Sequence, residues 1–310
     1  MDEVQSRFRF EFEQPAYNLF YTKANARLVQ PDWSITTMFV PHPSAALEYW
    51  FFKVNAGPIA LIVDWIERRK LNEHVLRVSV HSPYKREVIF EKLNSFMPGY
   101  NFMTTQKTVG HAREVSWDLE ITPNGDWFKP DVFPVGLLKM PDLAAFGAPL
   151  VTFNGWICHG PHQTTLDHVP GSITQYWGRQ LAAEWWWVSA HQFDQAGIVV
   201  EGTMLKSRVW GTSIQTPLAF LYLRQQDKRE FIIAPSNLAR VQGTPEEFHV
   251  EIKRMGKEKI TLNCKGREYG DFGDNIINTL TGDMELRVGD RVIARANGTA
   301  GLERLSPAST

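Results

Sequence analysis

Residues 47–54 read LEYWFFKV, and this stretch carries the strongest signal for the fold. On an extended backbone, Tyr49 and Phe51 share one face, while Glu48 and Trp50 share the other. The dipeptide at residues 57–58, Gly-Pro, then turns the chain into a second extended stretch, which predicts a β-hairpin. The same period of two dominates the rest of the chain, whereas long runs of helical spacing are scarce. The sequence therefore predicts an all-β protein.

Further expected strands follow at regular spacing on both sides of a long irregular region. Residues 116–122 form one of them, closed by the turn sequence PNGD. Residues 127–150 contain four prolines, which predicts a long connection with a short helix at Leu137–Phe146. Roughly eight strands in each half is the number expected for a small closed barrel. We therefore expect two consecutive antiparallel β-barrels with a few short helices, divided as residues 1–165 and 166–310.

The composition excludes several classes of protein. The 310 residues include 33 Lys plus Arg and 34 Asp plus Glu, so no surplus of cations is present to neutralise nucleic-acid phosphates. Two cysteines, Cys158 and Cys264, make neither a disulfide framework nor a zinc site. Because no apolar run suggests a signal peptide or a membrane span, we expect a cytoplasmic protein. The oligomeric state is left open.

The common cofactor and catalytic motifs are missing. The sequence has no GxGxxG or Walker loop, no Gly-x-Ser-x-Gly elbow and no His-Glu-x-x-His helix. His159, His162 and His168 lie near Asp167 in a loop with prolines, but their loose spacing favours solvated or loop-anchoring histidines over metal ligands. We therefore expect no cofactor and no metal.

The most distinctive feature is the concentration of tryptophan in residues 176–193. On a strand, Trp185, Trp187, Ser189 and His191 share one face. Indole, hydroxyl and imidazole groups together are typical of a pocket for a large apolar ligand with a few polar atoms. The alternative is that the tryptophans fill the interior of a wide barrel.

The first half of the chain offers two candidate acids. Glu48 shares a face with Trp50 and Phe52. If that face lines a barrel interior, Glu48 is a buried acid with a raised pKa, suited to donating a proton or a hydrogen bond. If it is the outer face, Glu48 is an ordinary surface charge. The same two alternatives apply to Asp64, which lies among isoleucines in the next strand.

Four motifs in the same order resemble one protein family over about 260 residues of the chain. They are residues 48–54 (EYWFFKV), 115–119 (VSWDL), the pair 176–178 (YWG) and 185–187 (WWW), and 298–304 (GTAGLER). This family is the two-domain lipocalin-like group of tocopherol cyclases, carotenoid 1,2-hydratases and decalin-forming Diels–Alderases. The resemblance implies two consecutive lipocalin-like barrels with the ligand held in or between them. It also implies work on a long isoprenoid or polyene without a metal or organic cofactor.

The sequence departs from this family pattern at the site where the hydratases and tocopherol cyclases are expected to place their acid. Ser172, Thr174, Gln175 and Tyr176 occupy that segment, and hydroxyls or an amide do not easily replace a proton donor. Cycloaddition asks less of the protein, because it needs a shaped apolar cavity and a hydrogen-bond donor. We therefore expect a cofactor-independent cyclase of the Diels–Alderase type. A proton-driven hydratase or cyclase and a non-catalytic carrier of a hydrophobic metabolite are the alternatives.

The expected site combines both halves of the chain around a hydrophobic polyene, polyketide or isoprenoid partner. Three residues are the candidates for catalysis, namely Glu48, Tyr176 and His191. The candidate binding residues are Trp50, Phe52, Asp64, Ser172, Gln175, Trp177, Trp185, Trp187 and Ser189.

Overall fold

The computed structural model describes residues 22–23, 45–97, 99–124, 126, 143–208, 215–235, 238–254 and 256–306. These residues form β-strands and turns almost throughout, and the helix found among them is a single 3-10 turn at Arg69–Leu71. The expected all-β fold is confirmed. The helix expected at Leu137–Phe146 is wrong from Leu143 onward, because a strand begins there, and residues 137–142 lie outside the described part.

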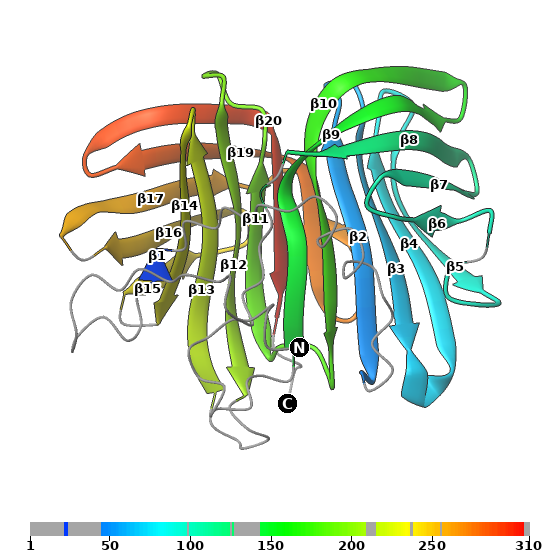
Figure 1. Cartoon of the computed structure of the whole chain (residues 1–310), viewed down its shortest axis with the longest axis horizontal. Helices are drawn as coiled ribbons and strands as arrows, with labels where there is room; N and C mark the ends of the chain where they lie inside the picture. The colour runs from blue at the N-terminus through cyan, green and yellow to red at the C-terminus, as the bar shows by residue number, and fades with distance from the viewer. Residues whose placement is uncertain are drawn as a thin grey trace, which may run out of the picture.

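The first sheet has nine antiparallel strands in the order β5-β4-β3-β2-β10-β9-β8-β7-β6 (Figure 1). Strands β2 to β5 pair successively as hairpins, as do β6 to β10, and β10 returns to pair with β2. The strands are β2 (Leu47–Asn55), β3 (Ala60–Arg68), β4 (Glu73–His81), β5 (Arg86–Leu93), β6 (Phe102–Met103), β7 (Lys107–Ala112), β8 (Val115–Pro123), β9 (Leu143–His159) and β10 (His162–Gly178).

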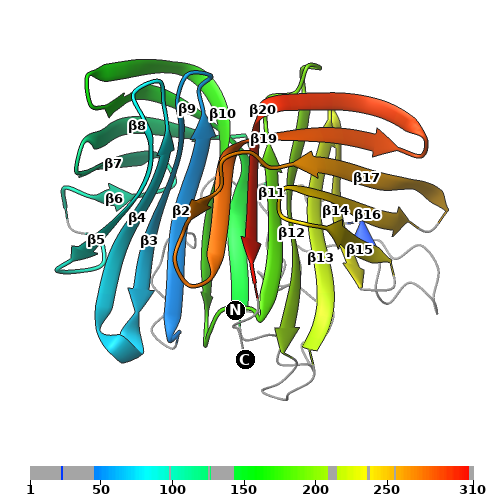
Figure 2. The same cartoon turned by 180° about the vertical axis from the view of Figure 1, so that it is seen from behind.

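The second sheet has eleven strands and is also antiparallel (Figure 2). Its order is β1-β14-β13-β12-β11-β20-β19-β17-β16-β15, and β18 pairs with β19 beside this path. The strands are β1 (Thr22–Lys23), β11 (Glu184–Ala190), β12 (Ile198–Arg208), β13 (Gln215–Gln225), β14 (Lys228–Pro235), β15 (Ala239–Gly243), β16 (Glu247–Arg254), β17 (Lys257–Lys265), β18 (Gly270–Asp271), β19 (Ile276–Val288) and β20 (Arg291–Leu305).

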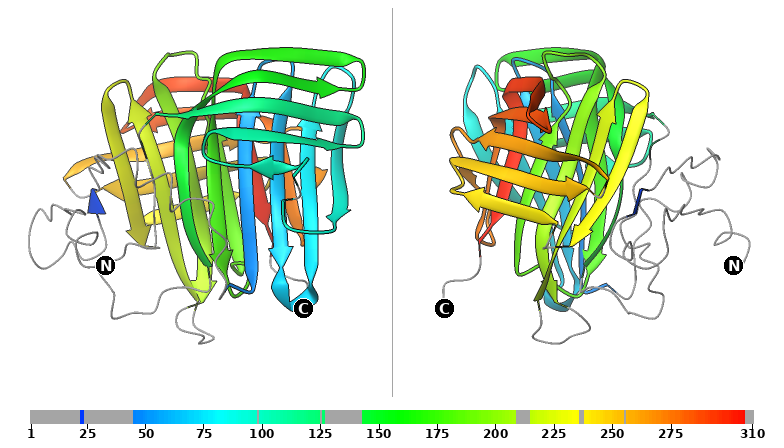
Figure 3. Two further views of the ribbon diagram at one scale, coloured as in Figure 1. Left: turned by 45° about the vertical axis from the view of Figure 1, so that its right-hand side comes forward. Right: turned by 90° about the vertical axis from the view of Figure 1, so that its left-hand side faces the viewer.

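Each sheet curls into a half-barrel (Figure 3). Within the described residues the pairing order of the first sheet ends at β5 and β6 without a pairing between them, so the sheet does not close as the strand count had suggested. The chain passes from the first sheet to the second between Gly178 and Glu184. This passage lies after the division expected at residues 165 and 166, because β9 and β10 pair as one long hairpin of the first sheet.

Each half-barrel encloses its own apolar core. Trp50, Phe52, Trp65 and Trp117 belong to the first core, and Val188 and other inward side chains of β11 belong to the second. Strand β8 shows the expected alternation of buried and more exposed residues, since one of its faces is covered. Strand β2 is buried at all nine positions. Both of its faces are therefore covered, one by the first core and one by the second sheet.

A third apolar cluster joins the two sheets. It contains Phe51 and Ile62 from the first sheet and Trp187, Ile276 and Leu305 from the second. In both front and back views, β2 and β10 of the first sheet lie next to β11, β19 and β20 of the second (Figures 1 and 2). The outward face of β2 thus becomes buried only when the two sheets pack together.

Candidate functional site

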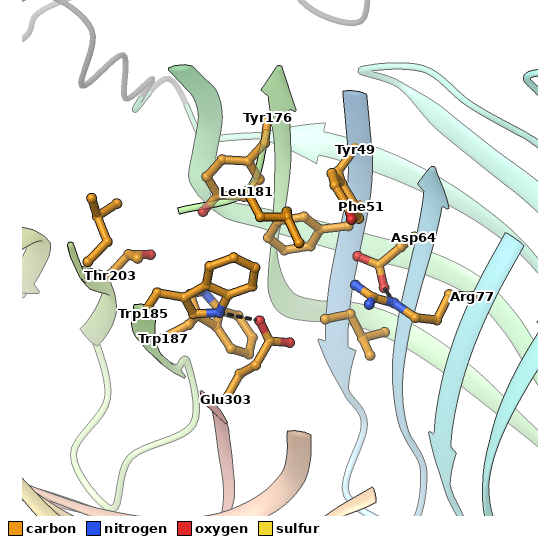
Figure 4. A pocket seen from close by; sticks show the side chains of 12 residues that line it. Tyr49, Phe51, Asp64, Arg77, Tyr176, Leu181, Trp185, Trp187, Thr203 and Glu303 are labelled. Carbon is orange, nitrogen blue, oxygen red and sulfur yellow. Dashed lines mark hydrogen bonds and ion pairs between the residues drawn. The ribbon is translucent and has the colours of Figure 1, made fainter. Parts of the chain in front are cut away.

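A pocket lies between the two sheets, next to this third cluster (Figure 4). Its empty space, including the part open to solvent, is about 620 Å³. Strands β2, β3, β4 and β10 provide one side, and β11, β12 and β20 provide the other. The lining residues are Tyr49, Phe51, Ile62, Asp64, Arg77, Tyr176, Leu181, Trp185, Trp187, Thr203, Leu205 and Glu303.

Aromatic rings make up much of the wall. Phe51 and Tyr176 stack with 5.8 Å between ring centroids and 10° between planes. The ring of Trp187 meets that of Phe51 edge-on, with 6.1 Å between ring centroids. Trp185 lies beside Trp187 on the same face of β11. Rings that pack against one another keep a fixed orientation. The pocket therefore has a rigid apolar wall built from both sheets.

A buried ion pair forms one end of the pocket. The Nε atom of Arg77 lies 3.1 Å from Oδ2 of Asp64, and the two residues are 4% and 3% exposed. Arg77 also donates from Nη1 to the carbonyl oxygen of Phe272 at 2.9 Å, and its guanidinium lies 3.7 Å from the centroid of the Phe272 ring. Burial raises the pKa of Asp64, and the charge of Arg77 opposes that rise. The positive charge of Arg77 is thus stabilised by the carboxylate of Asp64 and by the carbonyl oxygen and ring of Phe272.

A second carboxyl group, Glu303, reaches the pocket from β20. Its Oε1 accepts a hydrogen bond from Nε1 of Trp185 at 2.8 Å, and its Oε2 accepts one from Nδ2 of Asn278 at 3.0 Å. Burial raises the pKa of Glu303 to about 7, although the nearby charge of Arg77 acts in the opposite direction. A carboxyl group with this pKa exchanges a proton near neutral pH, as general acids and bases must.

Two tyrosine hydroxyls border the pocket, and that of Tyr176 interacts with the side chain of Thr203. Burial raises the pKa of Tyr176 well above its ordinary value and that of Tyr49 to about 12. Both phenols therefore keep their protons at neutral pH. The hydroxyl of Tyr49 is buried and makes no well-formed hydrogen bond among the described residues. A ligand in the pocket can satisfy it.

Behind Trp187 lies a polar cluster that does not line the pocket. The indole Nε1 of Trp187 donates to Oε1 of Glu201 at 2.6 Å. Lys53, which is 1% exposed, donates from Nζ to the carbonyl oxygen of Ser189 at 3.1 Å across the interface. Burial lowers the pKa of Lys53 and raises that of Glu201, and their mutual attraction opposes both shifts. This pair fixes the indole of Trp187 from behind and ties β2 to β11.

His191 belongs to the same cluster. Its Nε2 atom donates to the carbonyl oxygen of Pro149 at 2.8 Å, and its Nδ1 atom has no partner among the described residues. Burial and the charge of Lys53 lower the pKa of His191 to about 3. The imidazole is therefore neutral at physiological pH, which excludes it as a proton donor in the form of imidazolium. Ser172 is fully buried nearby, on β10.

Glu48 lies in the first barrel and not in the pocket. It is 0% exposed, and its Oε1 accepts hydrogen bonds from Nε1 of Trp50 and Nε2 of Gln175, both at 2.7 Å. Its Oε2 pairs with Arg69 at 2.8 Å. The interior alternative for Glu48 is thus the one that the structure shows. Its carboxylate is held by three donors and does not line the pocket.

The structure brings together only part of the predicted site. Tyr176, Asp64, Trp185 and Trp187 line the pocket. Three other predicted residues lie in the polar cluster behind Trp187, namely His191, Ser172 and Ser189. The remaining ones lie in or against the first core, namely Glu48, Trp50, Phe52, Gln175 and Trp177.

Several pocket residues were not predicted from the sequence. Tyr49 and Phe51 lie on the face of residues 47–54 opposite to Glu48, and that alternation was the available signal for them. Glu303 lies in the motif at residues 298–304, which had been noted only as part of the resemblance. Nothing in the sequence indicated that Arg77 lines the pocket, because an arginine in a strand is an ordinary residue until its partner is known.

Among the described residues, no group of three or more His, Cys, Asp or Glu side chains is arranged to hold a metal ion. In the same part of the chain, no helix has the length and apolar composition needed to cross a membrane.

Comparisons with known proteins give the fold class. No protein-family model and no curated protein sequence matches the chain. Among solved structures, kievitone hydratase from Nectria haematococca has a TM-score of 0.59 at 10% identity, covering 98% of this chain and 98% of that one. CghA with Sch210972 has a TM-score of 0.55 at 13% identity, covering 85% of this chain and 89% of that one. A protein assigned as AttH from Nitrosomonas europaea has a TM-score of 0.56 at 11% identity, covering 88% and 95%.

These similarities are similarities of fold. The chain shares the overall fold of these three proteins over most of its length. The solved structures that share this architecture include a hydratase and CghA, and their identities to this chain lie between 10% and 13%.

Proposed function

We propose that this chain is a cofactor-independent enzyme that folds a hydrophobic polyene in the pocket between its sheets and closes a ring by intramolecular Diels–Alder cycloaddition. The observation that carries the proposal is the meeting of a rigid aromatic wall with the neutral hydroxyl of Tyr176 in one pocket. The motif resemblance to decalin-forming Diels–Alderases and the fold shared with CghA support it.

Cycloaddition makes modest chemical demands, and this pocket meets them. A diene and an alkene within one molecule form two carbon–carbon bonds and one new double bond, and no atom enters or leaves. The protein has to hold the chain in the reactive conformation, an effect worth up to about 7–11 kcal/mol for well-oriented groups. A hydrogen-bond donor to a carbonyl on the alkene lowers the barrier further. Tyr176 provides this donor because its raised pKa keeps it protonated.

The test uses 1,7,9-decatrien-3-one, a neutral probe in which a conjugated diene is tethered to an enone. The rate of bicyclic ketone formation and the ratio of diastereomers are measured with and without the protein. We expect a faster reaction with a changed ratio, and a kcat lowered about 100-fold in Tyr176→Phe. Tyr100→Phe is the matched control, because Tyr100 is 54% exposed. A probe that binds without any acceleration would identify a carrier instead.

The raised pKa of Glu303 favours one second candidate, a proton-driven hydratase or cyclase. In this reaction the protonated carboxyl group gives its proton to a carbon–carbon double bond, and water or a second double bond attacks the resulting cation. The aromatic wall would stabilise that cation.

Isotope incorporation separates the two candidates. In D₂O the proton-driven reaction places one deuterium on carbon, whereas cycloaddition places none. The proton-driven reaction also predicts that Glu303→Gln abolishes turnover and that the rate falls as the pH rises through about 7, because the protonated form of Glu303 is the reactive one.

A further inference from the structure

The charges that line the pocket do not balance. Asp64 is paired with Arg77, whose guanidinium is also held by the carbonyl oxygen and the ring of Phe272. The hydrogen-bond donors to Glu303 are the neutral side chains of Trp185 and Asn278. Two carboxyl groups thus face one arginine. Glu303 must either hold a proton or lie beside a charge that the described residues do not supply.

The side chains around this carboxyl group are those that stabilise cations. Phe51, Tyr176, Trp185 and Trp187 present aromatic rings from both sheets to the pocket. The negative faces of aromatic rings attract ammonium groups, and cages of such rings are used to recognise quaternary ammonium ligands. Lys53 adds no positive charge to this wall, because it lies behind Trp187 with Glu201 and does not line the pocket.

A buried hydroxyl points to the same occupant. Tyr49 is 5% exposed and lines the pocket, and its hydroxyl makes no well-formed hydrogen bond among the described residues, although the charge of Arg68 acts on it. In Figure 4 the side chains of Tyr49, Asp64 and Glu303 converge on the same space. A phenol oxygen accepts a hydrogen bond from an N–H group, and the phenol ring attracts the positive charge.

We propose that the pocket selects a hydrophobic ligand that carries a positive charge, as a protonated or quaternary amine placed between Glu303 and the aromatic wall. The inference rests on the proposed function, and it names the class of substrate that this pocket takes. A polyene with a basic nitrogen is such a substrate. Its ammonium group would meet the carboxylate of Glu303, and its carbon chain would lie along the indoles of Trp185 and Trp187.

The test compares benzyltrimethylammonium with its neutral carbon isostere, neopentylbenzene. The two probes have the same shape, so the ratio of their dissociation constants isolates the effect of charge. Binding is followed by tryptophan fluorescence at pH 8, where Glu303 is ionised. We expect the ammonium to bind at least about tenfold more tightly than the isostere. In Glu303→Gln the ratio should fall, because only the attraction of the aromatic rings for the cation remains.

Controls separate loss of charge from loss of fold. Glu120→Gln removes an exposed glutamate on β8 and should leave the ratio unchanged. The comparison of two probes on the unaltered protein needs no variant at all. At pH 7, ammonium binding should also release protons from Glu303, seen as a buffer-dependent heat of binding that Glu303→Gln abolishes.

Three outcomes overturn the inference. They are binding of both probes within twofold of each other, a preference that Glu303→Gln leaves unchanged, and failure of the ammonium probe to bind. The proposed function is tested separately with the neutral trienone. Loss of the ammonium preference with cyclisation intact removes this inference alone, and the reverse result removes the cyclase proposal alone.

Discussion

Arg77→Met removes the cation from the buried pair in the pocket, and we expect it to destabilise the fold by about 3–5 kcal/mol. Arg77 and Asp64 are 4% and 3% exposed and lie 3.1 Å apart. Methionine keeps an unbranched apolar side chain, but it is shorter than arginine and donates no hydrogen bond. The substitution leaves the Asp64 carboxylate without its ion-pair partner, and the carbonyl oxygen of Phe272 loses its donor. Water cannot easily replace either one.

The loss of stability in Arg77→Met should depend on pH, because it depends on whether Asp64 is ionised. Burial raises the pKa of Asp64 in the native protein, and Arg77 opposes the rise. Without Arg77 the pKa rises further above the value of the unfolded chain. Because the cost belongs to the ionised form, it is largest above the new pKa and shrinks as the pH falls through it. Arg77→Met should therefore lose more stability at pH 8 than at pH 5.

Thermal unfolding followed by circular dichroism at both pH values is the assay. For a chain of this length each kcal/mol corresponds to about 2 °C, so the Tm should fall by about 6–10 °C at pH 8. Arg291→Met is the matched control, because Arg291 and Glu258 are also 3.1 Å apart but have 71% and 55% exposed side chains. An exposed pair contributes less than about 1 kcal/mol. Equal losses in the two variants, or equal losses of Arg77→Met at the two pH values, would refute the reasoning.

Three further predictions concern the interface and the first core. A Cβ at Gly301 would lie 2.9 Å from the ring of Trp187, so Gly301→Ala should displace that indole and destabilise the fold by about 1–3 kcal/mol. It should also weaken binding of a pocket probe at least about fivefold, as a fluorescence titration would show. Burial lowers the pKa of His191 to about 3, so its imidazole takes up a proton on unfolding below pH 6.5. The stability of the fold therefore falls as the pH drops from 6.5 toward 3. His191→Gln should make the decline of Tm over this range shallower. A Cβ at Gly110 would lie 2.3 Å from the ring of Trp117. Gly110→Ala should therefore lower the free energy of unfolding, measured in urea, by at least about 2 kcal/mol. A loss below about 0.5 kcal/mol would contradict the packing described for the first core.

The strands were largely predictable because they follow local rules. The hairpins of residues 47–67 form as expected, since alternation of side chains and turn residues such as Gly57 act over a few neighbours only. The boundary between sheets was less predictable. Residues 162–178 have strand character in any arrangement, and only pairing with β2 and β9 assigns them to the first sheet.

The candidate site was also predictable only in part. The alternation in residues 185–189 correctly grouped Trp185, Trp187 and Ser189 on one face, and the structure turns that face toward the other sheet. For residues 47–54 the same rule gave two faces without saying which one meets the pocket. The acid on the inward face, Glu48, and the base on the outward face, Lys53, are equally buried.

The sequence by itself determined the all-β class, the hairpins and the faces that successive side chains share, because these depend on the geometry of an extended backbone. Only the tertiary structure decided that the pocket lies between the sheets, that Arg77 and Glu303 line it, and that their charges do not balance. These features join residues about 200 positions apart in the chain, and no local pattern encodes which strand packs against which. The environment created by that packing, and not the residue type, raises the pKa of Glu303.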